Sequence, residues 1–236
     1  MTTRHTGGRG APLPRKAAAP LTTRRPSFLS GGAGPPRVSR NQEPRRFSRD
    51  ELEGFRNTTV ADLVGDNMRL LFVGINPGLW TAATQTHFAH PGNRFYPALL
   101  RGGVITLPIN PSTGMNDRER RHLIERGIGI TNIVDRATPR AAELSRDELR
   151  RGAEHLTAKI AGWRPRVVAI AGITAYRVAF ERPRAAVGRQ HETLAGAELW
   201  IVPNPSGLNT HETITSLAAA YRRVAKAAGV EVLGTN

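Results

Sequence analysis

The chain has 236 residues, enough for one domain with a sizeable core plus extensions, and its 39% hydrophobic and 6% aromatic content is ordinary for a globular protein. The absence of cysteine excludes disulfides, thiolate metal sites, iron–sulfur clusters and thiol nucleophiles, and no apolar run approaches the length of a membrane span. The formal net charge of +15 points to a polyanionic partner, most commonly nucleic acid and otherwise an anionic membrane surface. Because the N-terminus lacks the hydrophobic segment of a secretory signal, we expect a cytoplasmic protein.

Residues 1–47 differ in composition from the rest of the chain. They are rich in Gly, Pro, Ser and Arg, and ten Lys and Arg face a single acidic residue, Glu43. Such a segment buries too little apolar surface to offset its ordering entropy, so we expect a disordered basic arm, followed by a single domain over residues 48–236. The arm would add phosphate contacts to a nucleic-acid complex. The alternative is a solubilising tail or a wrongly assigned start.

From about residue 48 the sequence alternates strand and helix signals. Four apolar runs indicate strands: residues 69–75, 128–134, 166–172 and 198–203. Helical periodicity or helix-boundary residues mark four further segments: residues 93–103, 117–127, 145–163 and 212–228. Pro97 should lie in a first turn, Ser145 and Glu148 should form a capping box, and the Asn-Pro pair at Asn110 is assigned to a plain loop.

Strands separated by helices of this length predict right-handed crossovers between parallel strands. We therefore expect the α/β class, as a three-layer α/β/α sandwich with a mostly parallel central sheet. Ligands of such sheets bind beyond the carboxyl ends of the strands. Two strand-to-helix loops are therefore the candidate sites.

The first loop, residues 74–95, reads "GINPGLWTAATQTHFAHPGNRF", and its Asn-Pro-Gly sequence at Asn76 by itself predicts no more than a turn. The second, residues 203–212, reads "PNPSGLNTHE" and predicts a turn before a helix capped by Asn209 or Thr210, whose N-terminus suits a phosphate. Leu208 is poorly placed for packing between small residues. Exposed apolar wedges of this kind are inserted between stacked bases by some DNA-binding proteins.

The order and spacing of four motifs is more specific than either loop alone. "GINPGL", "FAHPGNRF", "TNIVDRAT" and "PNPSGLN" resemble the mismatch-specific uracil/thymine-DNA glycosylase family of the uracil-DNA glycosylase superfamily, over roughly residues 69–226. The resemblance implies a uracil-DNA glycosylase-like fold, a monomer acting on double-stranded DNA that contains uracil or mismatches, and neither metal nor cofactor. It also implies that the target nucleotide is flipped out and its N-glycosidic bond hydrolysed, which leaves an abasic site. Such a protein would be associated with the nucleoid.

The resemblance further implies roles for residues of the first loop. The amide of Asn76 would orient the attacking water. Because an amide is no strong base, the reaction would depend on departure of the base as an anion, stabilised by backbone N–H groups near Ile75 and Phe88. The Phe88 ring would stack on the flipped base, and the alternative is ordinary core packing.

Other polar residues of these motifs are candidates for the base pocket: Thr81, Asn93 and Asn132. Asn93 equally suits the cap of the following helix, and His90 is either an acid or, as is more common for such a residue, structural. Trp80 replaces a small residue of the family pattern. A bulkier wall there would exclude the thymine methyl group, which favours uracil as the substrate.

In the second motif, Asn204 and Ser206 would contact the phosphates that flank the flipped nucleotide. Leu208 would fill the gap left in the stack, and Gly207 would let the backbone approach the opposite strand. Asn209 belongs to the same DNA-binding loop. Where some relatives carry a basic residue after this motif, the chain has Thr210 and His211, which leaves a strict preference for guanine opposite the target open.

Two other functions compete with a glycosylase. A non-catalytic DNA-binding or lesion-sensing protein would use the basic arm and Leu208, and it would need no titratable catalytic group. A nucleotide-binding α/β protein would use the loop after the first strand, but "GINPG" lacks both the GxGxxG spacing and the lysine of a phosphate-binding loop.

Overall fold

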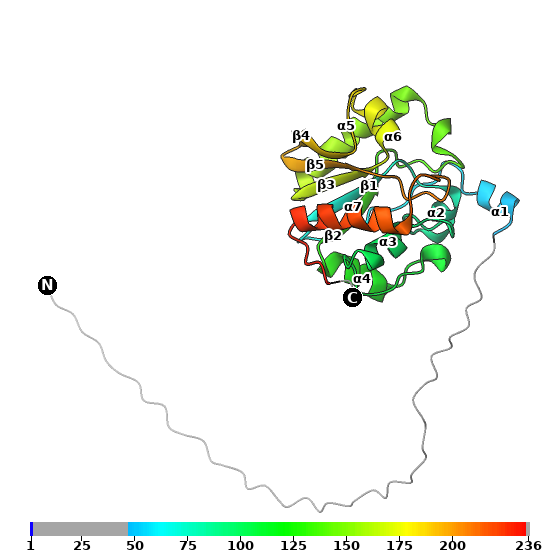
Figure 1. Cartoon of the computed structure of the whole chain (residues 1–236). Helices are drawn as coiled ribbons and strands as arrows, with labels where there is room; N and C mark the ends of the chain where they lie inside the picture. Colours follow the sequence, from blue (N-terminus) through cyan, green and yellow to red (C-terminus); the bar gives the residue numbers. More distant parts are fainter. Residues whose placement is uncertain (2–46, 235–236) are drawn as a thin grey trace, which may run out of the picture. The chain divides into compact units, whose positions relative to one another are not determined.

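The computed structural model describes Met1 and residues 47–234. The predicted disordered arm, residues 1–47, lies outside the described residues apart from Met1 and Phe47. Residues 47–234 belong to one compact unit, which is built around a five-stranded sheet (Figure 1). No helix in this described part of the chain combines the length and hydropathy needed to cross a membrane.

The sheet is parallel except at one edge. Its strand order is β2-β1-β3-β5-β4, with β1 (Leu70–Gly74) between β2 (Ile128–Asn132) and β3 (Val167–Ala171). The strand β5 (Ala197–Val202) runs parallel to β3, and only β4 (Gly188–Leu194) is antiparallel to its neighbour. The predicted mostly parallel sheet is therefore confirmed.

Helices cover both faces of the sheet, which confirms the three-layer prediction. Three helices pack on one face: α3 (Phe95–Arg101), α4 (Asp117–Glu125) and α7 (Ile214–Ala227). Two pack on the other: α5 (Arg146–Trp163) and α6 (Ile173–Ala179). Short helical segments complete the described chain: α1 (Arg49–Glu53), α2 (Leu79–Thr84) and the 3-10 turns η1 (Pro111–Thr113) and η2 (Ala141–Glu143).

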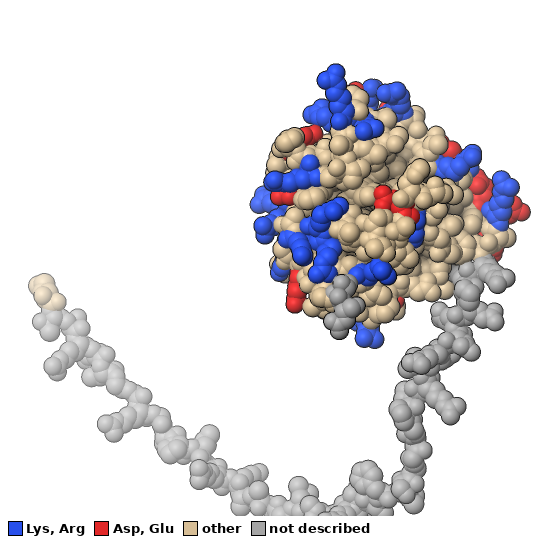
Figure 2. Space-filling model, in the orientation of Figure 1, with Lys and Arg blue, Asp and Glu red and all other residues tan. Residues whose placement is uncertain are grey.

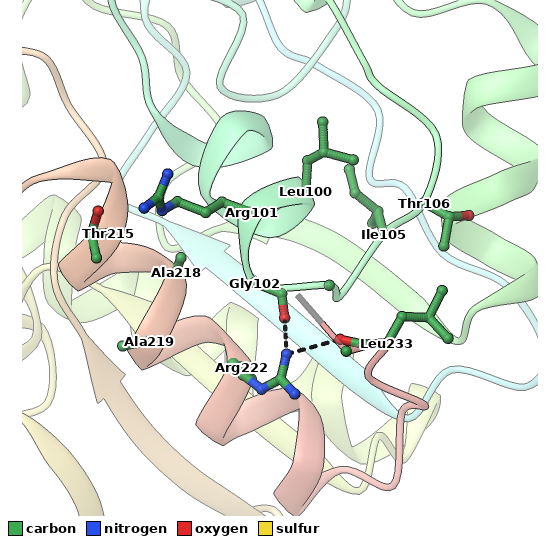
Figure 3. A pocket seen from close by; sticks show the side chains of 12 residues that line it. Leu100, Arg101, Gly102, Ile105, Thr106, Thr215, Ala218, Ala219, Arg222 and Leu233 are labelled. Atoms are coloured by element: carbon green, nitrogen blue, oxygen red, sulfur yellow. Dashed lines mark hydrogen bonds between the residues drawn. The ribbon is translucent and has the colours of Figure 1, made fainter. Parts of the chain in front are cut away.

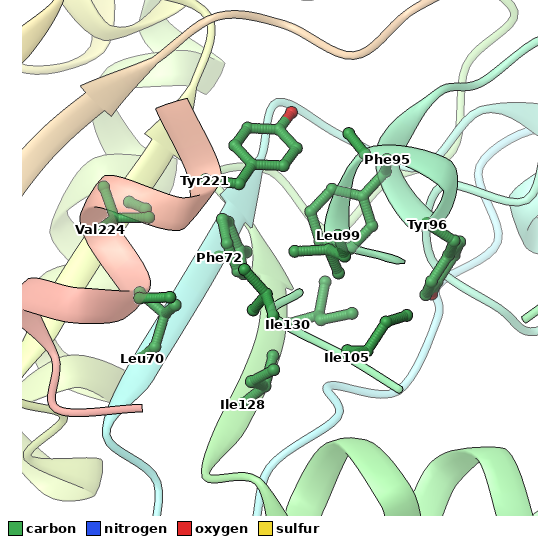
Figure 4. Close-up of a cluster of buried hydrophobic side chains, with 14 of the residues drawn as sticks. Leu70, Phe72, Phe95, Tyr96, Leu99, Ile105, Ile128, Ile130, Tyr221 and Val224 are labelled. Atoms are coloured by element: carbon green, nitrogen blue, oxygen red, sulfur yellow. The ribbon is translucent and has the colours of Figure 1, made fainter. Parts of the chain in front are cut away.

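Successive side chains of β1 explain why its apolar run is continuous. Leu70 and Phe72 point into the core under α3 and α7, whereas Leu71 and Val73 point into the core under α5. A strand alternates its side chains between two faces, so a strand buried on both must be apolar throughout. Figure 4 shows Phe72 among aromatic and aliphatic side chains from α3, α7 and β2.

Some helix boundaries differ from the sequence-based expectations. The helix α7 starts at Ile214 and is capped by Thr213, which forms a capping box with Ser216, so the expectation of Asn209 or Thr210 as the cap was wrong. Asn110 also does more than occupy a loop, because its side chain accepts the Ser112 N–H and caps η1. The other expectations hold: Ser145 and Glu148 form their capping box, and Pro97 lies in the first turn of α3.

Candidate active site

The loops after β1 and β5 converge beside Gly172, the residue that follows β3. β3 lies between β1 and β5, so the carboxyl ends of the three strands meet at one edge. A Cβ at Gly172 would lie 3.3 Å from Ile75 Cδ1 and 3.5 Å from Asn204 Nδ2. Gly172 has a φ of 123°, a conformation that favours glycine. Residues from the two predicted motifs thus face each other across a position that lacks a side chain.

Asn76 lies half-buried just beyond β1, and its amide nitrogen is held by three acceptors. Nδ2 donates to Thr138 Oγ1 at 2.7 Å and to the carbonyl oxygens of Pro77 and Arg136 at 3.1 Å each. The Thr138 hydroxyl donates its own proton to Arg140 O at 2.9 Å, so toward Asn76 it can only accept. The amide therefore cannot turn around, and Oδ1 accepts no hydrogen bond from the described residues.

The same surroundings explain why an amide stands here rather than a carboxylate. An ionised aspartate would place a second acceptor oxygen against the carbonyl oxygens of Pro77 and Arg136, both within hydrogen-bond distance of the Asn76 nitrogen. Two acceptors facing each other in a partly buried site are repulsive and leave both without a proton. The loop geometry therefore selects a group that donates on one side and accepts on the other.

Thr138 is a site residue that the sequence did not single out, although it lies in the motif "TNIVDRAT". It is 1% exposed, and its partner Asn76 is 62 positions away in the chain. Its backbone N–H also donates to Pro77 O at 3.1 Å, so it fixes the turn as well as the amide. Its position at the end of that motif was the signal in the sequence that could have indicated its role.

A second feature is the close approach of Asn132 and Phe88 to Gly74. A Cβ at Gly74 would collide with Asn132 Oδ1 and would lie 3.4 Å from the Phe88 ring. Because Gly74 lacks a side chain, the Asn132 amide oxygen and the Phe88 ring can both lie against its backbone, two positions before Asn76. Phe88 and Asn132 are two of the residues predicted to bind the base, and we call the three residues Gly74, Phe88 and Asn132 the pocket residues.

Phe88 joins the pocket to the core. One side of its ring stacks on Phe95 with a centroid distance of 4.1 Å. Phe88 therefore packs against the core on that side, as the alternative to base stacking expected. Its φ of 56° is unusual for a bulky residue and marks local strain. Both neighbours are anchored: His87 O accepts from the Tyr96 hydroxyl at 3.0 Å, and Ala89 N donates to Thr81 Oγ1 at 3.4 Å.

The anchored backbone leaves two N–H groups beside the pocket. Neither the Ile75 nor the Phe88 backbone N–H donates a hydrogen bond within residues 47–234. A buried or half-buried donor without an acceptor is uncommon in a folded protein and is a candidate for contact with a ligand. Both belong to the residues for which the sequence predicted such a role.

The other candidates of the first loop have local partners. Thr81 is buried and braces the segment that carries Phe88. Asn93 Oδ1 accepts the Phe95 N–H at 2.9 Å, although the N-cap residue of α3 is Arg94. His90 is exposed, and its Nδ1 accepts the Gly92 N–H at 3.1 Å. The Trp80 indole donates to Ser112 O at 3.0 Å and its ring lies against Phe47 and His90.

In the second loop, polar side chains shape the loop itself. Asn204 Oδ1 accepts the Ser206 N–H at 3.0 Å, Ser206 Oγ accepts the Leu208 N–H at 3.3 Å, and Asn209 Nδ2 donates to Asn204 O at 3.0 Å. These bonds hold Leu208 at the tip, where its side chain is 87% exposed. It is the most exposed large hydrophobic side chain within residues 47–234.

Arg94 ties the second loop to the first and was not predicted from sequence. Its guanidinium donates to three backbone carbonyl groups of the second loop, those of Ser206 (2.5 Å), Asn209 (2.7 Å) and Glu212. A Cβ at Gly207 would lie 2.7 Å from Gly92 O, so the two loops also touch through glycines. Arg94 Nε is buried without a hydrogen-bond partner among the described residues. The arginine acts as a clamp on the backbone around Leu208.

Lys and Arg side chains are unevenly spread over the face drawn in Figure 2. Figure 2 shows Lys and Arg side chains crowded on the side where β4 and the end of α7 lie. Near the two loops, by contrast, Arg94 is bound to carbonyl groups and Arg136 pairs with Glu148 at 2.8 Å. Phosphate contacts made by the loops would therefore depend on N–H and hydroxyl groups.

The molecule also has a surface hollow of about 720 Å³ between α3, α7 and the C-terminal segment (Figure 3). Arg222 spans it and donates to Gly102 O at 3.0 Å and to Leu233 O at 2.9 Å. None of the predicted site residues lines this hollow. In addition, no three His, Asp or Glu side chains in residues 47–234 come together as a metal site would require.

Comparison with known proteins matches the region that contains both loops. The model of the Uracil DNA glycosylase superfamily matches residues 61–225. Among solved structures, the chain is similar to a solution NMR structure described as a "putative Uracil DNA glycosylase from Methanosarcina acetivorans", with 16% sequence identity and a TM-score of 0.48. That similarity covers 70% of this chain and 96% of the other.

Proposed function

Because this chain belongs to the Uracil DNA glycosylase superfamily, we propose that it is a DNA glycosylase that hydrolyses the N-glycosidic bond of uracil in double-stranded DNA and leaves an abasic site. The observation that carries the proposal is the Asn76 amide. Its nitrogen is held by Thr138 Oγ1 and two carbonyl oxygens, and its oxygen is left for a ligand. It lies directly beyond β1, beside the pocket residues.

In this proposal Asn76 Oδ1 accepts a hydrogen bond from the attacking water. An amide does not titrate in the useful range, so it orients the water without removing its proton in advance. The bond between the base and the sugar must therefore break largely before the water attacks. The sugar then carries positive charge and the uracil leaves as an anion. The water adds to the sugar carbon and gives up one proton, which neutralises the uracil anion.

The departing anion needs donors that are already in place. The backbone N–H groups of Ile75 and Phe88, which donate to no acceptor in residues 47–234, are the proposed donors. Preorganised N–H groups of this kind each contribute roughly 10²–10³-fold to the rate in other enzymes that stabilise an oxyanion. The strained backbone of Phe88, with a φ of 56°, is held by neighbours on both sides and keeps its N–H in position.

Asn132 supports uracil rather than cytosine as the base. Its Oδ1 lies on the Gly74 side, and its Nδ2 carries a second hydrogen that is not needed for its bond to His87. Uracil presents an N3–H donor beside the O4 acceptor, which matches an amide oxygen beside an amide N–H. Cytosine presents an acceptor and a donor in the reverse order, and each unpaired buried group costs about 1–3 kcal/mol.

Leu208 supports action on duplex DNA. We propose that this exposed side chain enters the gap that the flipped nucleotide leaves, while the loop of Asn204, Ser206, Gly207 and Asn209 lies on the flanking backbone. Flipping costs a few kcal/mol and costs least for a mispaired base, so uracil opposite guanine is the proposed preferred substrate. The contacts of Trp80 with Ser112, Phe47 and His90 give no support to its predicted role in excluding thymine.

The test is excision from labelled duplexes with uracil, thymine or cytosine opposite guanine, in the presence of EDTA, followed by alkaline cleavage at abasic sites. The proposal predicts strand breaks at U·G and none at C·G, and the T·G duplex tests the sequence-based prediction that thymine is excluded. Binding to the U·G duplex without any breaks would favour the non-catalytic DNA-binding function. Excision that requires added metal would contradict the mechanism.

A further inference from the structure

His87 is a buried histidine that the proposed reaction does not yet use. It is 5% exposed and lies between the backbone of Ala61 and the side chain of Asn132. Its Nε2 is 3.0 Å from Ala61 O, and its Nδ1 is 3.3 Å from Asn132 Nδ2. Both ring nitrogens therefore have a partner, and each partner restricts where the ring proton can be.

The two contacts select one tautomer. A carbonyl oxygen only accepts, so Nε2 must carry the proton that binds Ala61 O. In a neutral ring, Nδ1 then has a lone pair and accepts from Asn132 Nδ2. If the Asn132 amide were reversed, its oxygen would face this lone pair and the hydrogen bond would be lost.

The ring is neutral at physiological pH. Burial lowers the pKa of His87 below its ordinary value of 6.5, and Arg120 acts in the same direction, against the Ala61 carbonyl, Asp62 and Asp135. The two carboxylates are themselves paired with Lys159, at 3.1 Å each. Asp62 also accepts the Thr131 hydroxyl at 2.5 Å. The nearby negative charge is thus largely compensated.

We propose that His87 is a positioning residue that fixes which end of the Asn132 amide faces the pocket, and so makes the pocket selective for uracil over cytosine. The inference rests on the proposed function. With Nδ2 bound to His87, Asn132 Oδ1 lies on the Gly74 side, where it would accept the uracil N3–H. A reversed amide would offer a donor at that place and would instead match the cytosine N3 acceptor.

Two substitutions separate this role from simple packing. His87→Leu introduces an apolar side chain of similar size and removes the acceptor at the Nδ1 position, together with the donor to Ala61 O. His87→Asn can place its own Oδ1 there and accept from Asn132. Thermal unfolding of both variants shows whether they are folded. Activity is then measured on uracil and on cytosine, each opposite thymine, so that both bases are mispaired.

For His87→Leu we expect kcat/KM for uracil to fall about tenfold, the loss expected when a bond that fixes a polar group is removed, and the ratio of uracil to cytosine excision to fall with it. His87→Asn should restore that ratio to within about threefold of wild type. The wild-type protein should also lose uracil activity as the pH falls through the His87 pKa, which lies below 6.5, because protonation puts a hydrogen on Nδ1 that faces Asn132 Nδ2. This acid limb should be missing in His87→Asn. A folded His87→Leu protein with wild-type selectivity would overturn the inference.

A measurement on the free protein keeps this test independent of the proposed reaction. The ¹⁵N chemical shifts of the His87 ring at pH 7 should show a protonated Nε2 and an unprotonated Nδ1. A proton on Nδ1 would overturn the inference even in an active enzyme. If the wild-type protein excises no uracil from any duplex, the proposed function fails, whereas the tautomer is still decided by the spectrum.

Discussion

Replacing Leu208 with Ala should damage duplex repair without damaging the fold. The side chain is 87% exposed, so its removal should change the free energy of unfolding by no more than about 0.5 kcal/mol. If the side chain is buried between bases in the complex, its loss removes about 1.5–3 kcal/mol of favourable burial. That corresponds to a factor of roughly 10 to 150 in the population of the flipped complex.

The assay is single-turnover excision of uracil from a U·G duplex at several enzyme concentrations, with 2-aminopurine beside the uracil to report unstacking. The loss should be confined to duplex DNA, because single-stranded uracil leaves no gap to fill. Val187→Ala is a matched control, since Val187 is a second exposed hydrophobic side chain, 53% exposed, beside β4 and away from the loops. An effect below threefold, or an equal loss on single-stranded DNA, would refute the wedge role.

Three further predictions follow from particular contacts. Gly74→Ala should abolish uracil excision but keep binding to abasic-site DNA, because its Cβ would occupy the space beside Asn132 Oδ1 and the Phe88 ring; measurable excision would contradict this pocket. Arg94→Met should raise KM more than it lowers kcat, because it frees the backbone around Leu208, whereas Arg101→Met on α3 should change neither; equal behaviour of the two variants would reject the clamp. The Ser145 N–H and the Arg136 guanidinium hold the pKa of Glu148 below its ordinary value of 4.5. The ionised Glu148 therefore stabilises the folded state above pH 4.5, and this contribution is lost as the pH falls through the lower pKa of the folded state. Urea unfolding between pH 3 and 6 should therefore show a weaker pH dependence for Glu148→Gln, and an unchanged slope would exclude the ion pair as a cause.

The layers of the fold could be predicted because β1 and β3 are continuous apolar runs buried on both faces, and the long helix α5 has its capping box. The strand β4 was missed because it lies at the sheet edge, where most of its polar side chains are exposed. The helix α2 was missed because it is short and Gly78 gives it no side-chain cap. Local patterns therefore identify elements that are long or fully buried, and they miss elements stabilised mainly by tertiary contacts.

The site shows the same limit. Asn76, Phe88, Asn132 and Leu208 could be assigned roles from the sequence because the family resemblance implies those roles, whereas Thr138 and Arg94 lie in the same motifs without such a role. Thr138, Arg94 and His87 act through partners far away in the chain: Arg94 reaches carbonyl groups 112 to 118 positions away, and His87 contacts Asn132 45 positions away. Spacing along one sequence carries no information about such pairs. The orientation of the Asn76 and Asn132 amides could be found only from the donors and acceptors around them.

The most direct measurement of the central claim is the single-turnover rate of Asn76→Ala and Asn76→Asp on a U·G duplex, together with their affinity for abasic-site DNA. Loss of the water-orienting amide should lower the rate by at least about 10²-fold while affinity stays within about threefold. The aspartate should not rescue the rate, since its second oxygen would face the carbonyl groups of Pro77 and Arg136. A rate within threefold of wild type for Asn76→Ala would contradict the assignment of Asn76 as the residue that holds the attacking water.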